Sequence, residues 1–423
     1  MTQITTMKTT TLKRQVLWLL CLTTVASGCD SQIPTERSLT SLRLSLRNPT
    51  EAELGSPANP VTPTQMTFDV DTLDEKGQPF SFDGNLYGYV IAGGSRLWLV
   101  DPCNNPNPTS DPTLLKTLSM RGGKVLSAQL PLNLPAIFGR VALNLEETKS
   151  RALGSTPAIY FPNPTITKLM KPLDITAPNA SYCSPYLSRQ VTVDRTETSA
   201  GKLIVSSIFQ NGLAVSDTSA PDYGSMYIFT FSQPSKDLQI GTVLERMSGS
   251  IAKFNGMTQL ANPILKATGE FRSDWVPVPI ELDKSRMPTG GPTSANNQWL
   301  TKRIASPVRV SGIVCEVGSD KNRADNWQKY NTVVINQLDL DPESEAGCGG
   351  VNLSYDKDMG TRFNVQLPGK GFGGFDPAQY AGQEATFVGM LQNAASKSGK
   401  TLFWTVVVRK TPDVCLKPKA ECP

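Results

Sequence analysis

Short apolar runs that end at Gly, Asn, Ser or Pro are the feature of this sequence that most restricts its fold. Within residues 201–260 such runs occupy positions 201–212, 224–231, 241–251 and 254–260. Runs of β-branched and aromatic residues bounded by turn-forming residues are typical of β-strands. With 33 glycines and 32 prolines scattered along 423 residues, long helices have little room. The pattern predicts an all-β chain of more than one domain.

Residues 201–260 carry a more specific signal. A Gly241-Thr242-Val243 step leads to Ser248-Gly249, and Phe254-Asn255-Gly256-Met257-Thr258-Gln259 follows. This order resembles the OB-fold modules of secreted bacterial nucleases and envelope proteins, and it covers about a seventh of the chain. The resemblance implies a small OB-like barrel over residues 188–288, with a fifth strand near 263–269.

A second barrel is expected over residues 306–412. Val310-Ser311-Gly312-Ile313-Val314 and the strand that begins Gly382-Gln383 and reaches Phe387-Val388-Gly389 are similar to segments of the first barrel. The similarity indicates an internal duplication. Residues 289–305, which contain a Pro/Gly-rich segment, are expected to form a flexible linker.

The segment before the barrels, residues 38–187, is expected to be a β-sandwich. An acidic residue followed by Gly77 and Pro79, then Phe82-Asp83-Gly84, resembles the turns of bacterial immunoglobulin-like modules. Further short strands are expected at 96–100, 125–130, 140–144, 158–161 and 189–193, which is the spacing of a sandwich. The expected architecture is therefore an immunoglobulin-like sandwich followed by two small OB-like β-barrels.

The first 28 residues have the three parts of an export signal. Lys8, Lys13 and Arg14 precede an apolar run at 16–22, and small residues lead into Cys29. The Ala26-Ser27-Gly28-Cys29 sequence resembles the lipobox of bacterial lipoproteins, although Ala26 stands where Leu is usual. The resemblance implies cleavage before Cys29, a covalent lipid on that cysteine, including palmitate-like acyl chains, and a tether over residues 29–37. The expected location is the cell envelope, with the outer membrane or cell surface favoured and the inner membrane left open by Asp30.

Charge and composition exclude several functional classes. Without the three basic residues of the signal, 38 basic residues remain against 37 acidic ones, so strong attraction to nucleic acid is not indicated. The chain has no histidine, which removes Ser-His and Cys-His catalysis and the commonest metal ligand. Acid–base chemistry by paired carboxylates remains open.

Six cysteines remain once Cys21 is removed with the signal and Cys29 is assigned to lipid. An even number in an exported chain favours disulfides, and fifteen pairings are possible. Proximity in sequence favours Cys103–Cys183, Cys315–Cys348 and Cys415–Cys422, the last pinning a tail at residues 413–423.

Tyr227, Phe229 and Phe254 are candidates for a ligand face on the first barrel. Exposed rings on OB strands stack bases or other planar groups. The alternative, which we favour, is that Tyr227, Phe229 and Phe231 fill the barrel interior. Residues 189–286 contain ten basic and ten acidic residues, which gives nucleic acid no electrostatic support.

Three other segments carry weaker signals, and for each the structural interpretation is favoured. Two acidic clusters could bind calcium but are expected to be a hairpin and a solvated loop, and a glycine-rich loop could hold phosphate but is expected to be a simple connection. These are Asp69, Asp71, Asp74 and Glu75; Asp339, Asp341, Glu343 and Glu345; and residues 369–374.

The sequence therefore favours a membrane-anchored, non-catalytic binding or scaffold protein, with no cofactor besides the lipid on Cys29. The expected partner is another envelope protein or a glycan. Binding of single-stranded or extracellular nucleic acid and carboxylate-based hydrolysis are the alternatives.

Overall fold

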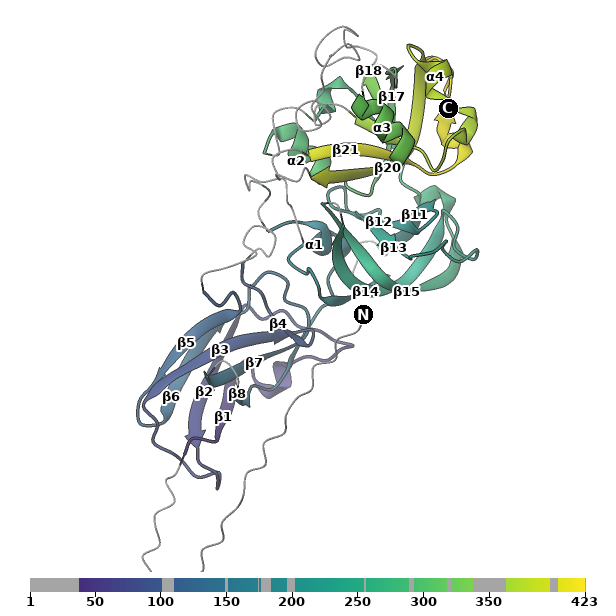
Figure 1. Ribbon diagram of the computed structural model, residues 1–423. Coiled ribbons are helices and arrows are strands. Elements are labelled where there is room, and N and C mark those ends of the chain that lie inside the picture. The colour runs from purple at the N-terminus through teal and green to yellow at the C-terminus, as the bar shows by residue number, and fades with distance from the viewer. Residues whose placement is uncertain are drawn as a thin grey trace, which may run out of the picture. The chain divides into compact units, whose positions relative to one another are not determined.

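A computed structural model describes residues 38–100, 110–148, 151–173, 175, 184–195, 202–254, 256–288, 293–317, 321–337, 363–395 and 402–422 (Figure 1). The chain from Leu39 onward forms one compact unit. The fold is all-β, as predicted, and its helices are short. Among the described residues, no helix combines the length and apolar character that crossing a bilayer requires.

Two antiparallel sheets form the N-terminal sandwich. One sheet has the order β1-β2-β6, with β1 at Ser41–Asn48, β2 at Gln65–Leu73 and β6 at Lys124–Pro131. In the other, β3 (Gly84–Ala92) pairs with β4 (Ser95–Arg96), β5 (Leu114–Met120) and β7 (Gly139–Thr148), and β7 pairs with β8 (Arg151–Ser155) and β9 (Ile159–Phe161). Phe68, Leu86 and Leu143 are fully buried between the sheets.

Strand β1 is an edge strand whose polar face is paired with β2. The side chain of Arg43 lies 2.9 Å from Asp71, and Arg47 lies 2.6 Å from Asp69. Asp74 accepts hydrogen bonds from the backbone N–H groups of residues 76 and 78 and so closes the following turn. These acidic residues therefore form the wet face and turn of a hairpin, which was the favoured interpretation of the first acidic cluster.

Five strands close into barrel 1: β11 (Leu203–Phe209), β12 (Gly212–Asp217), β13 (Ser225–Phe229), β14 (Thr242–Phe254) and β15 (Met257–Phe271). They pair in the order β11-β12-β13-β15-β14-β11. The β13–β15 pair is parallel, and β10 (Gln190–Asp194) adds to β14 from outside. This is a five-stranded barrel of the OB type. The expected fifth strand at 263–269 is the second half of β15.

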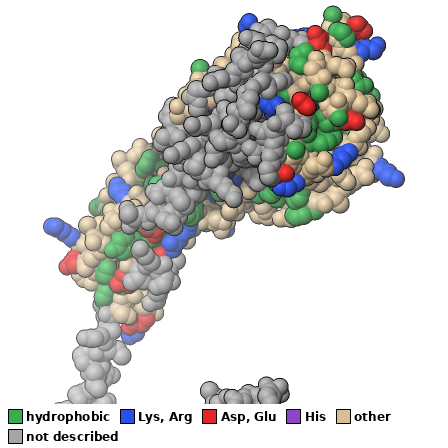
Figure 2. Space-filling model, turned by 45° about the horizontal axis from the view of Figure 1, so that its top comes forward, with side chains coloured by type: hydrophobic (Ala, Val, Ile, Leu, Met, Phe, Trp, Pro, Cys, Tyr) green, Lys and Arg blue, Asp and Glu red, His purple; other side chains and the backbone are tan. Residues whose placement is uncertain are grey.

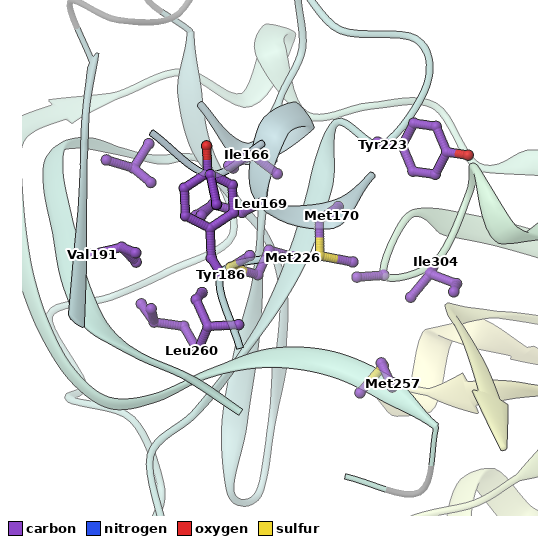
Figure 3. Packing of buried hydrophobic residues seen from close by; sticks show 14 of the residues in the cluster. Ile166, Leu169, Met170, Tyr186, Val191, Tyr223, Met226, Met257, Leu260 and Ile304 are labelled. Atoms are coloured by element: carbon purple, nitrogen blue, oxygen red, sulfur yellow. The ribbon is translucent and has the colours of Figure 1, made fainter. Parts of the chain in front are cut away.

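A short helix before barrel 1, α1 (Ile166–Met170), completes its core. Thr165 caps the helix by accepting a hydrogen bond from the N–H of Lys168. The helix packs against β13, and Figure 3 shows Ile166 and Leu169 beside Met226. These apolar side chains close one end of the barrel.

Barrel 2 repeats this arrangement. Its strands are β17 (Pro307–Val314), β18 (Thr332–Gln337), β19 (Phe363–Gln366), β20 (Glu384–Ala395) and β21 (Leu402–Val408). They pair in the order β17-β18-β19-β21-β20-β17, again closed by a parallel pair, β19–β21. The remaining elements are β16 (Ile280–Leu282), α2 (Ala295–Thr301), α3 (Lys321–Tyr330), α4 (Pro377–Tyr380) and β22 (Val414–Cys415). The shared strand order agrees with an internal duplication.

Helix α2 lies within residues 289–305, which the sequence suggested as a flexible linker. Its Asn297 is buried and accepts a hydrogen bond of 2.6 Å from the indole N–H of Trp404. The C-terminal half of that segment is therefore ordered against β21. The polar residues of this segment include Ser294, which caps helix α2, and Asn297, whose amide is buried.

Gly312 is required where β17 bends to join both β18 and β20. A Cβ at this position would lie 2.0 Å from the carbonyl oxygen of Asn336 and 2.6 Å from the side chain of Ile335. A Cβ atom cannot lie so close to these atoms, so the pairing of β17 with β18 at this point requires glycine.

The predicted disulfide between Cys415 and Cys422 is present. Cys315 is also disulfide-bonded, and its partner lies outside the described residues. Cys29, Cys103, Cys183 and Cys348 lie outside them too, so those predictions stay predictions. Figure 2 shows side chains of both charges interspersed on the face drawn, in keeping with the near-neutral composition.

Candidate functional site

The aromatic side chains of barrel 1 lie on its outer face. Residues directly opposite in an antiparallel pair point to the same side of a sheet. Leu213 and Ile228 are opposite each other, fully buried, and belong to the interior. Their neighbours Tyr227 and Phe229 therefore point outward, opposite Ala214 and Gly212. The favoured expectation that these rings fill the barrel is wrong, because Met226 and Ile228 occupy the interior.

Two ring pairs lie on β11, on β13 and just after β13, and together we call them the aromatic row: Phe209, Tyr227, Phe229 and Phe231. The ring centroids of Phe209 and Tyr227 are 5.9 Å apart, in an edge-on arrangement. Those of Phe229 and Phe231 are 4.5 Å apart. Exposure differs among the rings: Tyr227 is 7% exposed, Phe209 and Phe229 are partly buried, and Phe231 is 67% exposed. The row is thus buried at Tyr227 and open to solvent at Phe231.

Tyr227 is the most buried ring of the row. Its hydroxyl donates a hydrogen bond of 2.8 Å to the side-chain oxygen of Asn211, and burial raises its pKa to about 12. The ring lies over Gly212, where an added Cβ would be 2.6 Å from a ring carbon. Glycine at this position lets the ring pack against the backbone and holds it in one orientation.

The rest of this outer face is covered. The hydroxyl of Ser216 lies 2.9 Å from that of Ser206 and 2.8 Å from that of Ser225. Ser225 in turn accepts a hydrogen bond of 3.2 Å from Ser306, at the entrance to barrel 2. Arg409 of barrel 2 donates to the backbone oxygen of Ser206. The aromatic row is the part of the β11–β13 face that these contacts leave open.

Phe254 lies away from the row, although the sequence grouped it with Tyr227 and Phe229. Phe254 pairs with Met257 of β15, whereas Phe229 pairs with Ala261. Four residues along a strand separate them by about 13 Å. Phe254 is 57% exposed, so the structure places it on the surface without bringing it to the row.

The residues that follow Phe209 and Phe231 in the chain form a polar, uncharged rim to the row. They are Gln210, Asn211, Ser232 and Gln233, and all four are exposed. In the part of the chain that the structure describes, the cation–π contacts occur at other rings, such as Arg272 over Trp275 and Arg303 over Trp299. The surface therefore combines ring faces with amide and hydroxyl groups.

Acidic side chains were the remaining candidates for metal binding and for acid–base chemistry. They contain no group of three or more Cys, Asp or Glu side chains that could hold a metal ion. A hydrogen bond from Arg47 lowers the pKa of Asp69, and one from Ser285 lowers that of Asp283. A general acid in glycoside hydrolysis needs the opposite shift.

The two other weak signals have different outcomes. Residues 369–374 form tight turns that bond to themselves, with the N–H of Gly374 donating to the oxygen of Gly371. A phosphate cradle would need such N–H groups free. The second acidic cluster, Asp339 to Glu345, lies outside the described residues.

No protein-family model matches this chain, and no curated protein matches it either. The residues of the site therefore have to support any functional conclusion. The sequence analysis did not select Phe209 and Asn211 as site residues. The short Gln210-Asn211 turn before Gly212 could have indicated them, because it places Phe209 beside Tyr227 of β13.

Proposed function

We propose that this chain is a lipid-anchored, non-catalytic binding protein of the bacterial envelope whose ligand is a glycan. The aromatic row of barrel 1 is the binding surface. The anchor is the lipid on Cys29, and the location is the outer membrane or cell surface.

The observation that supports this proposal most is the exposure of the row beside a rim of amides. An exposed Phe231 packed on Phe229 offers a flat apolar surface that gains free energy when covered. The apolar face of a sugar ring is a suitable cover, and its hydroxyl groups match amide donors and acceptors. OB strands that correspond to β12 and β13 bind oligosaccharides in other proteins.

Charge favours a glycan over nucleic acid. Surfaces that follow a single strand combine aromatic rings with basic residues that neutralise phosphates. The rim residues Gln210, Asn211, Ser232 and Gln233 carry no charge. A neutral ligand with many hydroxyl groups fits this rim better than a polyanion.

The test uses the full chain, purified in detergent, and two variants of matched type. Phe231→Ala removes a ring of the row, and Phe254→Ala removes another exposed ring elsewhere on barrel 1. The probes are insoluble peptidoglycan sacculi in a co-sedimentation assay and soluble chito-oligosaccharide in calorimetry. Loss of one stacked ring costs roughly 1–2 kcal/mol, so Phe231→Ala should weaken binding about tenfold.

Binding that is equally weak in both variants, or absent from the wild-type chain with both probes, would contradict the proposal. Salt-sensitive binding of single-stranded oligothymidylate that disappears in Phe231→Ala would favour the nucleic-acid alternative instead. Thermal unfolding of both variants should match the wild type, because neither ring is buried.

A further inference from the structure

A second surface of barrel 1 contributes to a cleft of about 850 Å³. The cleft lies where β7 and β9 of the sandwich meet β10, β14 and β15, within the single unit that begins at Leu39. The cleft shares no residue with the aromatic row and is therefore a separate candidate site.

Part of the lining is apolar, and we call this part the apolar wall. It includes Pro57, Pro60 and Pro162 and the ring of Tyr160, whereas the side chain of Phe161 is buried on the other face of β9. The backbone of Tyr160 fixes this wall, because its oxygen accepts from the N–H of Val61 and its N–H donates to the oxygen of Leu54. Rings and prolines held in this way form a rigid surface on which a flat ligand group can pack.

The lining also contains charged residues, and most of their charges are already paired. Asp194 accepts hydrogen bonds from Arg246 at 2.5 Å and from Asn163 at 2.9 Å. The carboxylate of Glu245 lies 2.8 Å from Lys266. Arg195 lies 3.4 Å from Glu270. These pairs hold the charged side chains in place and leave little charge for a ligand.

Arg140 differs from the other charged residues of the cleft. It is exposed, and its guanidinium group has no ion pair or hydrogen bond among the described residues. In the antiparallel β7–β9 pair it stands directly opposite Tyr160, so both side chains project from the same face of the sheet. The cleft thus combines an unpaired cation with an aromatic ring and an apolar wall.

We propose that this cleft is a second binding site, which takes an acidic oligosaccharide through a sugar carboxylate. The planar guanidinium group of Arg140 matches a carboxylate with two parallel hydrogen bonds. Tyr160 and the prolines cover the apolar face of the sugar. The side-chain oxygen of Asn163, whose nitrogen donates to Asp194, also lines the cleft and suits one of its hydroxyl groups.

Calorimetric titration of the full chain with oligogalacturonate tests this assignment, and its methyl ester is the uncharged control ligand. The acid form should bind with an affinity that falls as salt is added, and the ester should bind at least tenfold more weakly. Arg140→Gln should weaken binding of the acid form about tenfold or more, since a charge-assisted pair is lost.

Arg121→Gln is the matched control variant. Arg121 follows the β5 residue that pairs with Gly84, whereas Val141, beside Arg140, pairs with Ala92 at the other end of β3. Eight residues of strand place these two ends about 26 Å apart. Arg121→Gln should therefore bind like the wild type.

Three results would overturn the inference: no binding of oligogalacturonate, equal binding of its ester, or unchanged binding in Arg140→Gln. A Phe231→Ala chain provides an independent readout. It should bind oligogalacturonate normally, because the aromatic row is a separate site, and its failure to do so would also overturn the inference.

Discussion

Replacing Gly312 with alanine should destabilise barrel 2 selectively. The new Cβ would lie 2.0 Å from a backbone oxygen of β18. Carbon and oxygen atoms that are not bonded need more than 3 Å, so β17 and β18 must separate by about 1 Å. A rotamer change cannot relieve this contact because the obstructing atom belongs to the main chain.

The expected cost follows from what that separation disturbs. Gly312 pairs with Gln337 of β18 and with Ala385 of β20, and the nearby N–H of Cys315 donates to the oxygen of Val334. Overpacking in a close-packed region costs about 1–3 kcal/mol. Because the clash is with backbone, we expect a value near the upper end, about 3 kcal/mol.

Native-state hydrogen exchange, read by peptide, measures this locally. It suits a chain of several domains, for which a single unfolding midpoint is poorly defined. A loss of about 3 kcal/mol corresponds to exchange roughly a hundredfold faster in peptides from β17, β18 and β20. Peptides from the sandwich should exchange as in the wild type.

Gly369→Ala is the control. A Cβ at Gly369 would meet nothing within 4 Å, and its cost should be below about 0.5 kcal/mol. Exchange in Gly312→Ala within threefold of the wild type would refute the steric reasoning. Equal acceleration by Gly369→Ala would refute it as well.

Two further predictions concern the anchor and the response to pH. Cys29→Ala should abolish incorporation of labelled fatty acid and membrane association, whereas Cys21→Ala should leave both unchanged; labelling that persists in Cys29→Ala would contradict the lipoprotein assignment. At Asp222, burial alone would raise the pKa, but hydrogen bonds and charge from Arg303 and Lys302 outweigh it and lower the pKa below its ordinary value of 3.8. Its contribution to stability should therefore be present above pH 4 and be lost as the pH falls through the lowered value, and a carboxyl NMR titration should show Arg303→Gln moving the midpoint upward.

Much of the fold could be predicted because strand periodicity and turn residues are local signals. The runs around Val205, Tyr227 and Val365 appear as strands where the sequence suggested them. The sequence missed β5, whose polar Lys116 and Ser119 conceal its pattern, and α1, which is too short to show helical periodicity. Tertiary packing, not propensity, decides such elements.

The site was harder to predict, because a strand pattern gives two faces without saying which is inside. The rings at positions 227 and 229 alternate with Met226 and Ile228, and either set could have filled the barrel. Residues outside the strand decide which face is the interior. Helix α1 and Tyr186 supply apolar side chains at Met226 and so fix that face as interior (Figure 3).

Closure of the two barrels affects how closely copies of the protein can be packed on a membrane. If Cys29 carries a lipid, neighbouring copies share a surface at high local concentration, where open strand edges would join and aggregate. The parallel β13–β15 and β19–β21 pairs close both barrels and leave their five strands without such edges. The sandwich keeps β1 as an edge, but Arg43 and Arg47 place charge along it. Copies could then be displayed densely and still remain separate molecules.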